Sequence, residues 1–404
     1  MNAPWLHVIG ITERGLDGLD PATRTLLGTA HVIGPPRAIA PLLVAGHPAT
    51  PWHAPLGAML DQILARRGAP TVVLATGDPS WFGIGATLAR HLSTEEFAIL
   101  PAPSAFSLAA ARLHWPLQDV ACLSAHGRTV AALVPHIQPG ARLLALTSGA
   151  STVAAIVELL TGLGYGESRL SVLNRMGGLE ESRVDFIATE HTGAGVADFN
   201  TLAIECVAVA GTPLRPAVPG LPDEAFLNDG QLTKREVRAV TLARLAPIPG
   251  ALLWDVGAGC GSVAIEWMRA ARGARALVIE RDASRRELIA KNAEALGTPD
   301  LTVSPRPAPE GFPDYERPDA IFLGGDVGNA ILFEACWQTL PPGGRLVANA
   351  VTLDGEAALI ERQSRLGGEL VRISIERLDR IGAHNILRPL MPVTQWALVK
   401  AHEP

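Results

Sequence analysis

Short apolar runs alternate with amphipathic stretches along the first half of the chain. The amphipathic stretches at 21–27 and 84–91 have helical spacing, and Asp20 with Pro21 forms a helix start signal. The apolar runs predict strands at 6–10, 71–75, 97–100, 142–146, 170–173 and 202–209. Strands and helices in alternation indicate an α/β domain.

The second half repeats this alternation more regularly. Its apolar runs predict seven strands, at 252–256, 276–280, 301–304, 319–323, 345–350, 370–376 and 394–400. Helices are expected between them, near 263–271, 284–296, 330–340 and 356–366. This rhythm predicts a doubly wound, mostly parallel, Rossmann-like sheet of seven strands, with a ligand crevice at the carboxyl ends of its central strands.

Four prolines spaced three residues apart separate the halves, namely Pro213, Pro216, Pro219 and Pro222. Each proline ring restricts its own backbone and keeps the preceding residue out of the helical region, so the stretch favours an extended connector. We therefore expect one domain over residues 1–212, a linker over 213–224 and a second domain over 225–404.

The composition is that of a globular protein. Of the 404 residues, 48% are hydrophobic, and the formal net charge of −6 argues against general attraction to nucleic acid or to an anionic membrane. The N-terminal stretch lacks the pattern of a signal peptide, and the uncharged run at 143–157 is too short to span a bilayer. The four cysteines are far apart, so we expect a reducing cytoplasm and no metal site.

A glycine-rich loop follows the first strand of the second half. Asp255 lies near the end of that strand, and Gly257, Gly259 and Gly261 follow at alternate positions. Glycine permits a tight turn and lets a ligand approach the main chain. The spacing differs from the dinucleotide pattern, and the carboxylate favours a ligand that carries ammonium and sulfonium groups. With Glu280 ending the next strand, where it can accept hydrogen bonds from ribose, the pattern predicts an S-adenosylmethionine site.

The motifs of the second half resemble those of a known family. DVGAGCGS at 255–262 and PPGGRLV at 341–347 are similar to motifs of class I S-adenosylmethionine-dependent methyltransferases. More specifically, LNDGQLTKREVRAVTLARL at 227–245, IFLGGDVG at 321–328 and ANAVT at 348–352 resemble the CbiT-type methyltransferases of the cobalamin pathway.

The resemblance to the CbiT type implies that the methyl donor also contacts Thr233, Arg281 and Gly324. Two residues depart from the family pattern. Asp326 stands where a small hydroxyl residue is common, and Cys260 takes a place often held by threonine. Neither change removes the turn.

Loops of the first half resemble those of the CbiE-type tetrapyrrole methylases. GDP at 77–79 and PAPSAF at 101–106 each connect a strand to a helix, whereas GITERG at 10–15 departs from the family's G-x-G-P-G. The resemblance implies a two-lobed α/β fold that holds a folded methyl donor largely by main-chain groups. The implied donor contacts are Gly10, Ile11, Gly77, Asp78, Ser104, Ala105, Thr147 and Met176.

Together the two resemblances imply a bifunctional enzyme with one S-adenosylmethionine site in each domain. It would convert precorrin-6B to precorrin-8X by methylation at C5 in the first domain, methylation at C15 in the second, and decarboxylation of the C12 acetate. Electron-rich meso carbons need no strong base, so positioning does most of the catalysis. The relatives of the second half also imply a homo-oligomer, such as a tetramer formed through that domain.

The expected catalytic residues lie in the second half. Lys234 and Arg235, with the nearby Arg238, are expected to meet substrate carboxylates, Asp326 to lie at the same crevice, and His384 to carry a proton. The stretch around His384, including Arg380 and Arg388, otherwise reads as a solvated basic loop.

Two other functions remain open. The second domain could methylate RNA or protein, although LGGDVGN at 323–329 lacks the Asn/Asp-Pro-Pro-aromatic motif that holds a flipped base. The chain could also be a donor-binding scaffold without chemistry, which the intact glycine loops disfavour.

Overall fold

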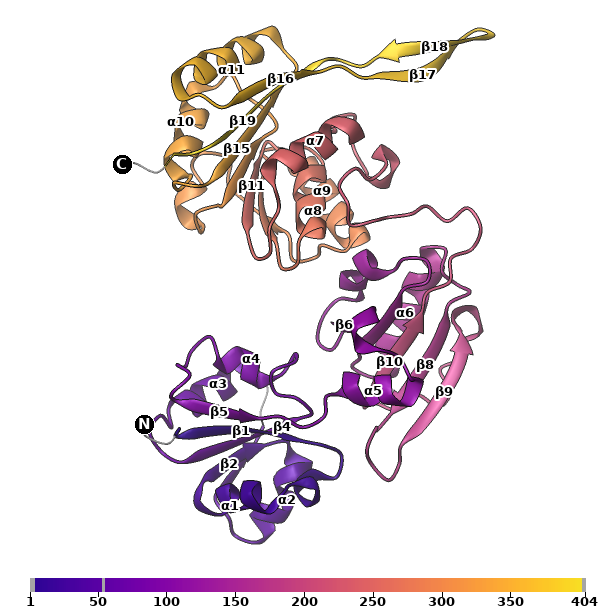
Figure 1. Ribbon diagram of the computed structural model, residues 1–404, viewed down its shortest axis with the longest axis vertical. Helices are drawn as coiled ribbons and strands as arrows, with labels where there is room; N and C mark the ends of the chain where they lie inside the picture. The colour runs from indigo at the N-terminus through magenta and orange to yellow at the C-terminus, as the bar shows by residue number, and fades with distance from the viewer. Residues whose placement is uncertain (1–3, 53–54, 402–404) are drawn as a thin grey trace. The chain divides into compact units, whose positions relative to one another are not determined.

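The chain forms two compact units in the computed structural model, which describes residues 4–52 and 55–401 (Figure 1). The first unit comprises Met1–Val130 and His136–Thr212, and the second comprises Ala131–Pro135 and Pro213–Pro404. The outermost residues of the two expected domains, at 1–3 and 402–404, lie outside the described residues. In the described part of the chain, no helix is long and apolar enough to cross a membrane.

The first unit contains two sheets of five strands, which match its expected two lobes. All strand pairs of the first sheet are parallel, in the order β3 (Ala49–Pro51), β2 (His31–Gly34), β4 (Thr71–Thr76), β1 (Leu6–Ile11), β5 (Phe97–Leu100). The second sheet is mixed, in the order β6 (Val120–Ser124), β7 (Arg142–Leu146), β10 (Asn200–Glu205), β8 (Arg169–Asn174), β9 (Ser182–Ile187).

Six α-helices connect or flank these strands in the described part of the first unit: α1 (Pro21–Thr29), α2 (Pro36–Val44), α3 (Leu56–Leu64), α4 (Ile84–Leu88), α5 (Ala105–Leu113) and α6 (Ala150–Gly162). The predicted start of α1 is confirmed, because the Asp20 carboxylate accepts the backbone N–H groups of Ala22 and Thr23. Ser104 likewise begins α5, where its hydroxyl accepts the Ser107 N–H.

The second unit contains the expected seven-stranded sheet. Its order is β13 (Thr302–Val303), β12 (Arg275–Ile279), β11 (Leu252–Val256), β14 (Ala320–Leu323), β15 (Arg345–Ala350), β19 (Val393–Val399), β16 (Glu369–Ile373). The first five strands are parallel, and β19 runs antiparallel to both of its neighbours. The helices of this unit are α7 (Arg235–Leu245), α8 (Ser262–Ala270), α9 (Ala283–Leu296), α10 (Ala330–Thr339) and α11 (Leu353–Leu366).

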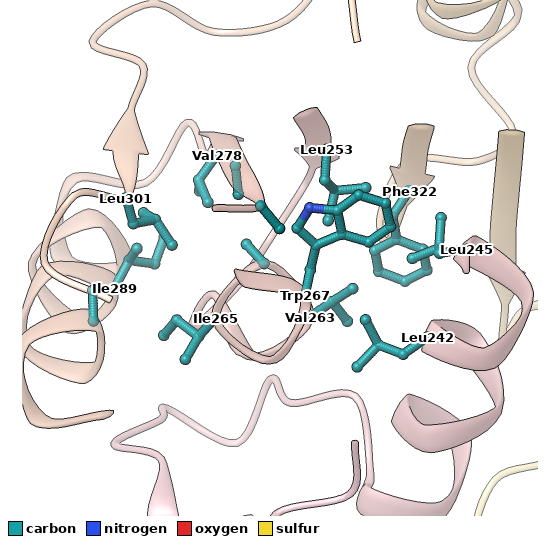
Figure 2. Packing of buried hydrophobic residues seen from close by; sticks show 14 of the residues in the cluster. Leu242, Leu245, Leu253, Val263, Ile265, Trp267, Val278, Ile289, Leu301 and Phe322 are labelled. Atoms are coloured by element: carbon teal, nitrogen blue, oxygen red, sulfur yellow. The ribbon is translucent and has the colours of Figure 1, made fainter. Parts of the chain in front are cut away.

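Trp267 lies at the centre of the core on one face of this sheet. Figure 2 shows its ring beside Leu253 and Phe322 of the sheet, with Leu245 of α7 close by. The indole is 1% exposed, and its Nε1–H donates to the backbone oxygen of Arg275 (3.0 Å). The apolar face of α8 therefore fixes where the glycine-rich turn before it enters the helix.

Sequence reasoning missed several strands. Short β2, β3, β6 and β9 were not predicted, and the predicted strand 202–209 ends at Glu205. The stretch considered as a basic loop instead forms a hairpin of β17 (Glu376–Ile381) and β18 (His384–Pro389), which extends away from the seven-stranded sheet (Figure 1). Its turn uses Gly382 at φ 57°, a conformation that glycine adopts without steric cost.

The proline-rich connector is anchored to the second unit. The Arg269 guanidinium donates to the backbone oxygens of Arg215 (2.7 Å) and Pro216 (3.3 Å). The Glu266 carboxylate, also on α8, accepts the N–H groups of Gly220 (2.6 Å) and Leu221 (2.9 Å). The end of the connector is therefore part of the packing of the second unit rather than a free tether.

Candidate functional site

A cleft of about 650 Å³ lies in the second unit, at the carboxyl ends of β11, β12, β14 and β15. This is where doubly wound sheets bind ligands. Eight of the residues expected at this site line it: Thr233, Lys234, Gly257, Gly259, Glu280, Arg281, Gly324 and Asp326. Five expected residues are not among its lining residues: Arg235, Arg238, Asp255, Gly261 and His384.

The glycine loop brings three backbone segments together. A Cβ on Gly257 (φ 72°) would lie 3.0 Å from the Gly325 nitrogen, and a Cβ on Gly259 (φ 59°) would lie 3.1 Å from the Gln231 oxygen. Gly261 (φ 80°) begins α8, and a Cβ there would lie 3.1 Å from Ile289. The first two glycines line the cleft and let neighbouring backbone segments approach the loop, while Gly261 lets α8 pack against α9.

Glu280 is held in place at the rim of the glycine loop. Its Oε2 accepts the Gly259 N–H (2.9 Å), and its Oε1 accepts the Asp282 N–H (3.0 Å). The residue is 5% exposed and lines the cleft. Each oxygen keeps further acceptor capacity, so the carboxylate has a fixed orientation suited to binding a diol.

Asp255 supports the loop from inside the protein. Its side chain is fully buried, and its Oδ2 accepts the Ala264 N–H (3.1 Å) in the first turn of α8. Its Oδ1 has no hydrogen-bond partner among the described residues. Burial, together with the nearby Glu280 charge, raises the pKa of Asp255 to about 7.

This raised pKa predicts a pH-dependent stability of the second unit. Between the unfolded pKa of about 3.9 and the folded value of about 7, Asp255 keeps its proton in the folded chain and loses it in the unfolded chain. The unfolding free energy therefore falls as pH rises through this window. We expect Asp255→Asn to raise the unfolding free energy by on the order of 4 kcal/mol at pH 8 and by about 1.5 kcal/mol at pH 5. Urea unfolding monitored by hydrogen exchange in β11 measures the difference. The exposed Asp314→Asn is the control, and an equal gain at both pH values would contradict the prediction.

Of the basic residues expected at the start of α7, only Lys234 lines the cleft. Lys234 precedes the helix, is half-buried and lines the cleft, whereas Arg235 is exposed outside the lining. Arg238 is 0% exposed and pairs with Glu266 (2.8 Å) and Asp223 (3.3 Å). The expectation that Arg238 meets substrate is therefore wrong, because its charge is used inside the fold.

Asp326 and His384 lie in different surroundings. Asp326 has a φ of 54°, rare for a residue with a side chain, and its Oδ2 accepts from the Asn329 side chain (3.1 Å). Such strained positions cluster at functional sites. His384 begins β18, is exposed, and pairs in register with Ile381 at the far end of the hairpin.

The first unit brings its expected loops together around Gly10. A Cβ on Gly10 would lie 2.2 Å from the Gly77 oxygen and 2.4 Å from the Ala102 nitrogen, two atoms that form a hydrogen bond (3.4 Å). The Gly77 N–H donates to the Ile11 oxygen (2.7 Å), and a Cβ on Gly77 would lie 3.7 Å from the Ala105 nitrogen. Main-chain groups from three successive loops thus meet at one point.

The side chains of three other expected donor contacts, Asp78, Thr147 and Met176, interact with other residues of the first unit. Asp78 accepts the Ser80 N–H (2.8 Å) within its own loop. Thr147 follows β7 and donates to Asn200 Oδ1 (2.8 Å), and both residues are buried. Met176 packs with Phe106 of α5 in the core beside the second sheet.

An exposed aromatic pair follows Asp78. Trp81 and Phe82 are 40% and 44% exposed, and both rings pack on Phe106, with centroids 5.2 and 5.9 Å away. Phe82 adopts φ 56°, an outlier for an aromatic residue. The Arg128 guanidinium lies 5.7 Å from the Phe82 ring, and no carboxylate of the described chain pairs with it. The loop therefore presents apolar faces beside an available cation.

Comparison with known proteins links the two units to two families. Residues 224–400 match the family described as "Precorrin methyltransferase domain", and residues 7–188 match "Tetrapyrrole (Corrin/Porphyrin) Methylases". A Sinorhizobium protein named precorrin-6Y C(5,15)-methyltransferase (decarboxylating) is 46% identical over 98% of this chain and 97% of its own length. The chain belongs to this family.

Further relatives have the same printed name. A Mycobacterium tuberculosis protein is 42% identical over 97% of this chain and 99% of its own length. A crystal structure of the C-terminal domain of precorrin-6Y C5,15-methyltransferase from Rhodobacter capsulatus is 43% identical, covers 46% of this chain and 99% of that chain, and has a TM-score of 0.43. The resemblances inferred from the loops of both halves are confirmed at the level of the family.

Sequence reasoning missed part of the cleft of this family member. Part of its lining comes from Asn349 near the end of β15, from Val351 after it, and from residues at the base of the hairpin, including Ile375 and Met391. Asn349 and Val351 lie in ANAVT, at the end of a predicted strand. The apolar residues at the base of the hairpin gave no signal, because their exposure depends on the fold.

Proposed function

We propose that this chain catalyses the reaction named in its relatives, the methylation of precorrin-6Y at C5 and C15 with decarboxylation, in cobalamin biosynthesis. The carrying observation is that the two family matches occupy the two halves of a chain that aligns with such enzymes over nearly its full length. In this proposal the first unit methylates C5, and the second methylates C15 and releases carbon dioxide from the C12 acetate.

Each unit is proposed to bind one molecule of S-adenosylmethionine, which supplies an electrophilic methyl group. In the second unit, the fit rests on the glycine loop, whose Gly257 and Gly259 line the cleft without side chains, and on the fixed Glu280 carboxylate. In the first unit it rests on the meeting point of Gly10, Gly77 and the start of α5. The residues orient the donor so that a ring carbon attacks the methyl in line with the departing sulfur.

The substrate is a macrocycle with several carboxylates, and both units offer suitable groups. In the first, Trp81 and Phe82 supply apolar faces and Arg128 a cation. In the second, Lys234 and Arg281 line the cleft as cations, and Asp326 lies beside them as a candidate proton carrier. His384 and Arg235 do not line the cleft, so we propose them only for contacts with parts of the substrate that extend beyond it.

The proposal includes a homo-oligomer. An isolated two-stranded hairpin is marginal in water, and β17–β18 exposes Leu378 (71%), Ile381 (59%) and Leu387 (62%). Packing of these hairpins between chains, as in a tetramer, would bury that surface. Light scattering should give a multimeric mass that Leu378→Glu reduces, and a monomeric wild type would refute this part. A cytoplasmic location is also proposed, since all four cysteines are free thiols.

The test uses the full chain, a cobalt-free precorrin and S-adenosylmethionine labelled in its methyl group. Mass spectrometry should detect two labelled methyl gains and one carboxyl loss per macrocycle. Donor binding without turnover would favour a scaffold, and label transferred to RNA would favour the rival methyltransferase class. Either result would overturn the proposal.

A further inference from the structure

A buried network of three polar side chains stands behind one wall of the cleft in the second unit. Asn349 of β15 lines the cleft and is half-buried. Gln395 of β19, its partner in the antiparallel register, is 0% exposed, as is Thr241 of α7. Side chains at paired register positions share one face of the sheet, so α7 covers both amides.

The hydrogen bonds of this network determine how both amide groups are oriented. The Thr241 hydroxyl donates its single hydrogen to the Val237 oxygen (2.8 Å), so it can only accept from its other neighbours. Asn349 Nδ2 (3.0 Å) and Gln395 Nε2 (2.9 Å) must therefore be the donors to it. The second N–H of Gln395 donates to Asn349 Oδ1 (2.9 Å).

These bonds leave Asn349 with one unused donor at the cleft. Its Oδ1 is occupied by Gln395, and one of its two N–H groups is occupied by Thr241. The network is not explained by stability alone, because the Gln395 Oε1 is buried and has no partner among the described residues, a cost of about 1–3 kcal/mol. The arrangement instead fixes one amide N–H at the wall of the site.

We propose that Asn349 is a catalytic residue for decarboxylation, whose free N–H holds the acetate carboxylate that is lost, and that Thr241 and Gln395 are its positioning residues. This inference rests on the proposed function. In the step, the bond between the acetate methylene and its carboxylate carbon breaks, and carbon dioxide leaves. The electron pair moves into the protonated, conjugated macrocycle; the methylene carbon then takes a proton from water to become a methyl group, and the ring returns its own proton to the solvent, so that one proton is taken up overall.

A neutral amide suits this step for an electrostatic reason. The carboxylate loses its charge as carbon dioxide forms, so a guanidinium or ammonium contact would stabilise the starting state more than the transition state. An amide N–H orients the carboxylate so that the breaking bond can align with the ring π-system. It stabilises the charged starting state less than a cationic side chain would.

The experiment compares carbon dioxide release with methyl transfer in the full chain. Asn349→Ala should lower carbon dioxide release by about 10²-fold, the usual effect of removing one aligned donor. Binding of S-adenosylmethionine, measured by calorimetry, and C5 methylation should change less than about twofold, since neither uses this group. The exposed Gln338 of α10 provides the control: Gln338→Ala should leave all three readouts unchanged.

The positioning residues are tested by a conservative pair. Thr241→Val removes the acceptor for both amides and should lower carbon dioxide release with donor binding intact, whereas Thr241→Ser keeps the hydroxyl and should restore it. The inference is overturned if Asn349→Ala releases carbon dioxide at the wild-type rate, or if release and C15 methylation fall in parallel. A wild type that neither methylates nor decarboxylates would instead refute the proposed function. If Asn349→Ala fails to bind the donor, carbon dioxide release by Thr241→Val and Thr241→Ser tests the inference instead, and equal release by these two variants would overturn it.

Discussion

Replacing Gly10 with alanine should abolish methyl transfer by the first unit while the second unit keeps its chemistry. The new Cβ would lie 2.2 Å from the Gly77 oxygen and 2.4 Å from the Ala102 nitrogen, both of them backbone atoms that cannot rotate away. The two loops that they belong to must separate, and a displacement of about 1 Å at a reacting site costs about 10²-fold in rate. We expect C5 methylation to fall at least that far.

The measurement is the position of labelled methyl groups in the product, read by mass spectrometry and carbon NMR. Gly28→Ala in α1 is the matched control, because a Cβ there meets nothing within 4 Å and alanine favours a helix by about 1 kcal/mol. If Gly10→Ala retained C5 methylation, or lost C15 methylation equally, the assignment of separate chemistry to the two units would fail.

Gly10 also illustrates what sequence reasoning can find. A strand, a glycine and a helix start in succession specify a backbone turn from local residues alone, so the loops at 10, 77, 104 and 257 were predictable. The central strands β11 and β14 of the second unit were predictable from their apolar runs, which are buried on both faces of the sheet. The hairpin at 376–389 was not, because it is largely exposed and its polar and apolar residues carry no burial signal.

Side-chain roles within the site were harder to predict than backbone turns. Asp255 was expected near the ligand because it adjoins the glycine loop, but its carboxylate turns inward to α8. Asn349 carries its one free N–H only because Thr241 and Gln395, distant in sequence, occupy its other polar positions. Such roles depend on contacts between elements, which periodicity and motif spacing do not encode.

Replacing Arg238 with methionine should destabilise the second unit by about 3–5 kcal/mol, since it leaves the buried Glu266 carboxylate without its cation. The two side chains are 0% and 2% exposed and lie 2.8 Å apart. Arg238 also donates to the backbone oxygens of Leu221 and Thr233, so the connector and the segment before α7 each lose one of their contacts with α7. Hydrogen exchange of amides in β11 and β14 during urea unfolding of the full chain measures the loss for this unit alone.

The matched control is Arg275→Met, which breaks an ion pair with Glu316 whose side chains are 52% and 63% exposed and should cost less than about 1 kcal/mol. Equal losses in the two variants would contradict the prediction. Adding Glu266→Met to Arg238→Met should recover only part of the stability. Apolar replacement of a buried pair is often neutral, but Glu266 also accepts the N–H groups of Gly220 and Leu221, and these donors would then be buried without partners. Full recovery would mean that the connector does not depend on this carboxylate.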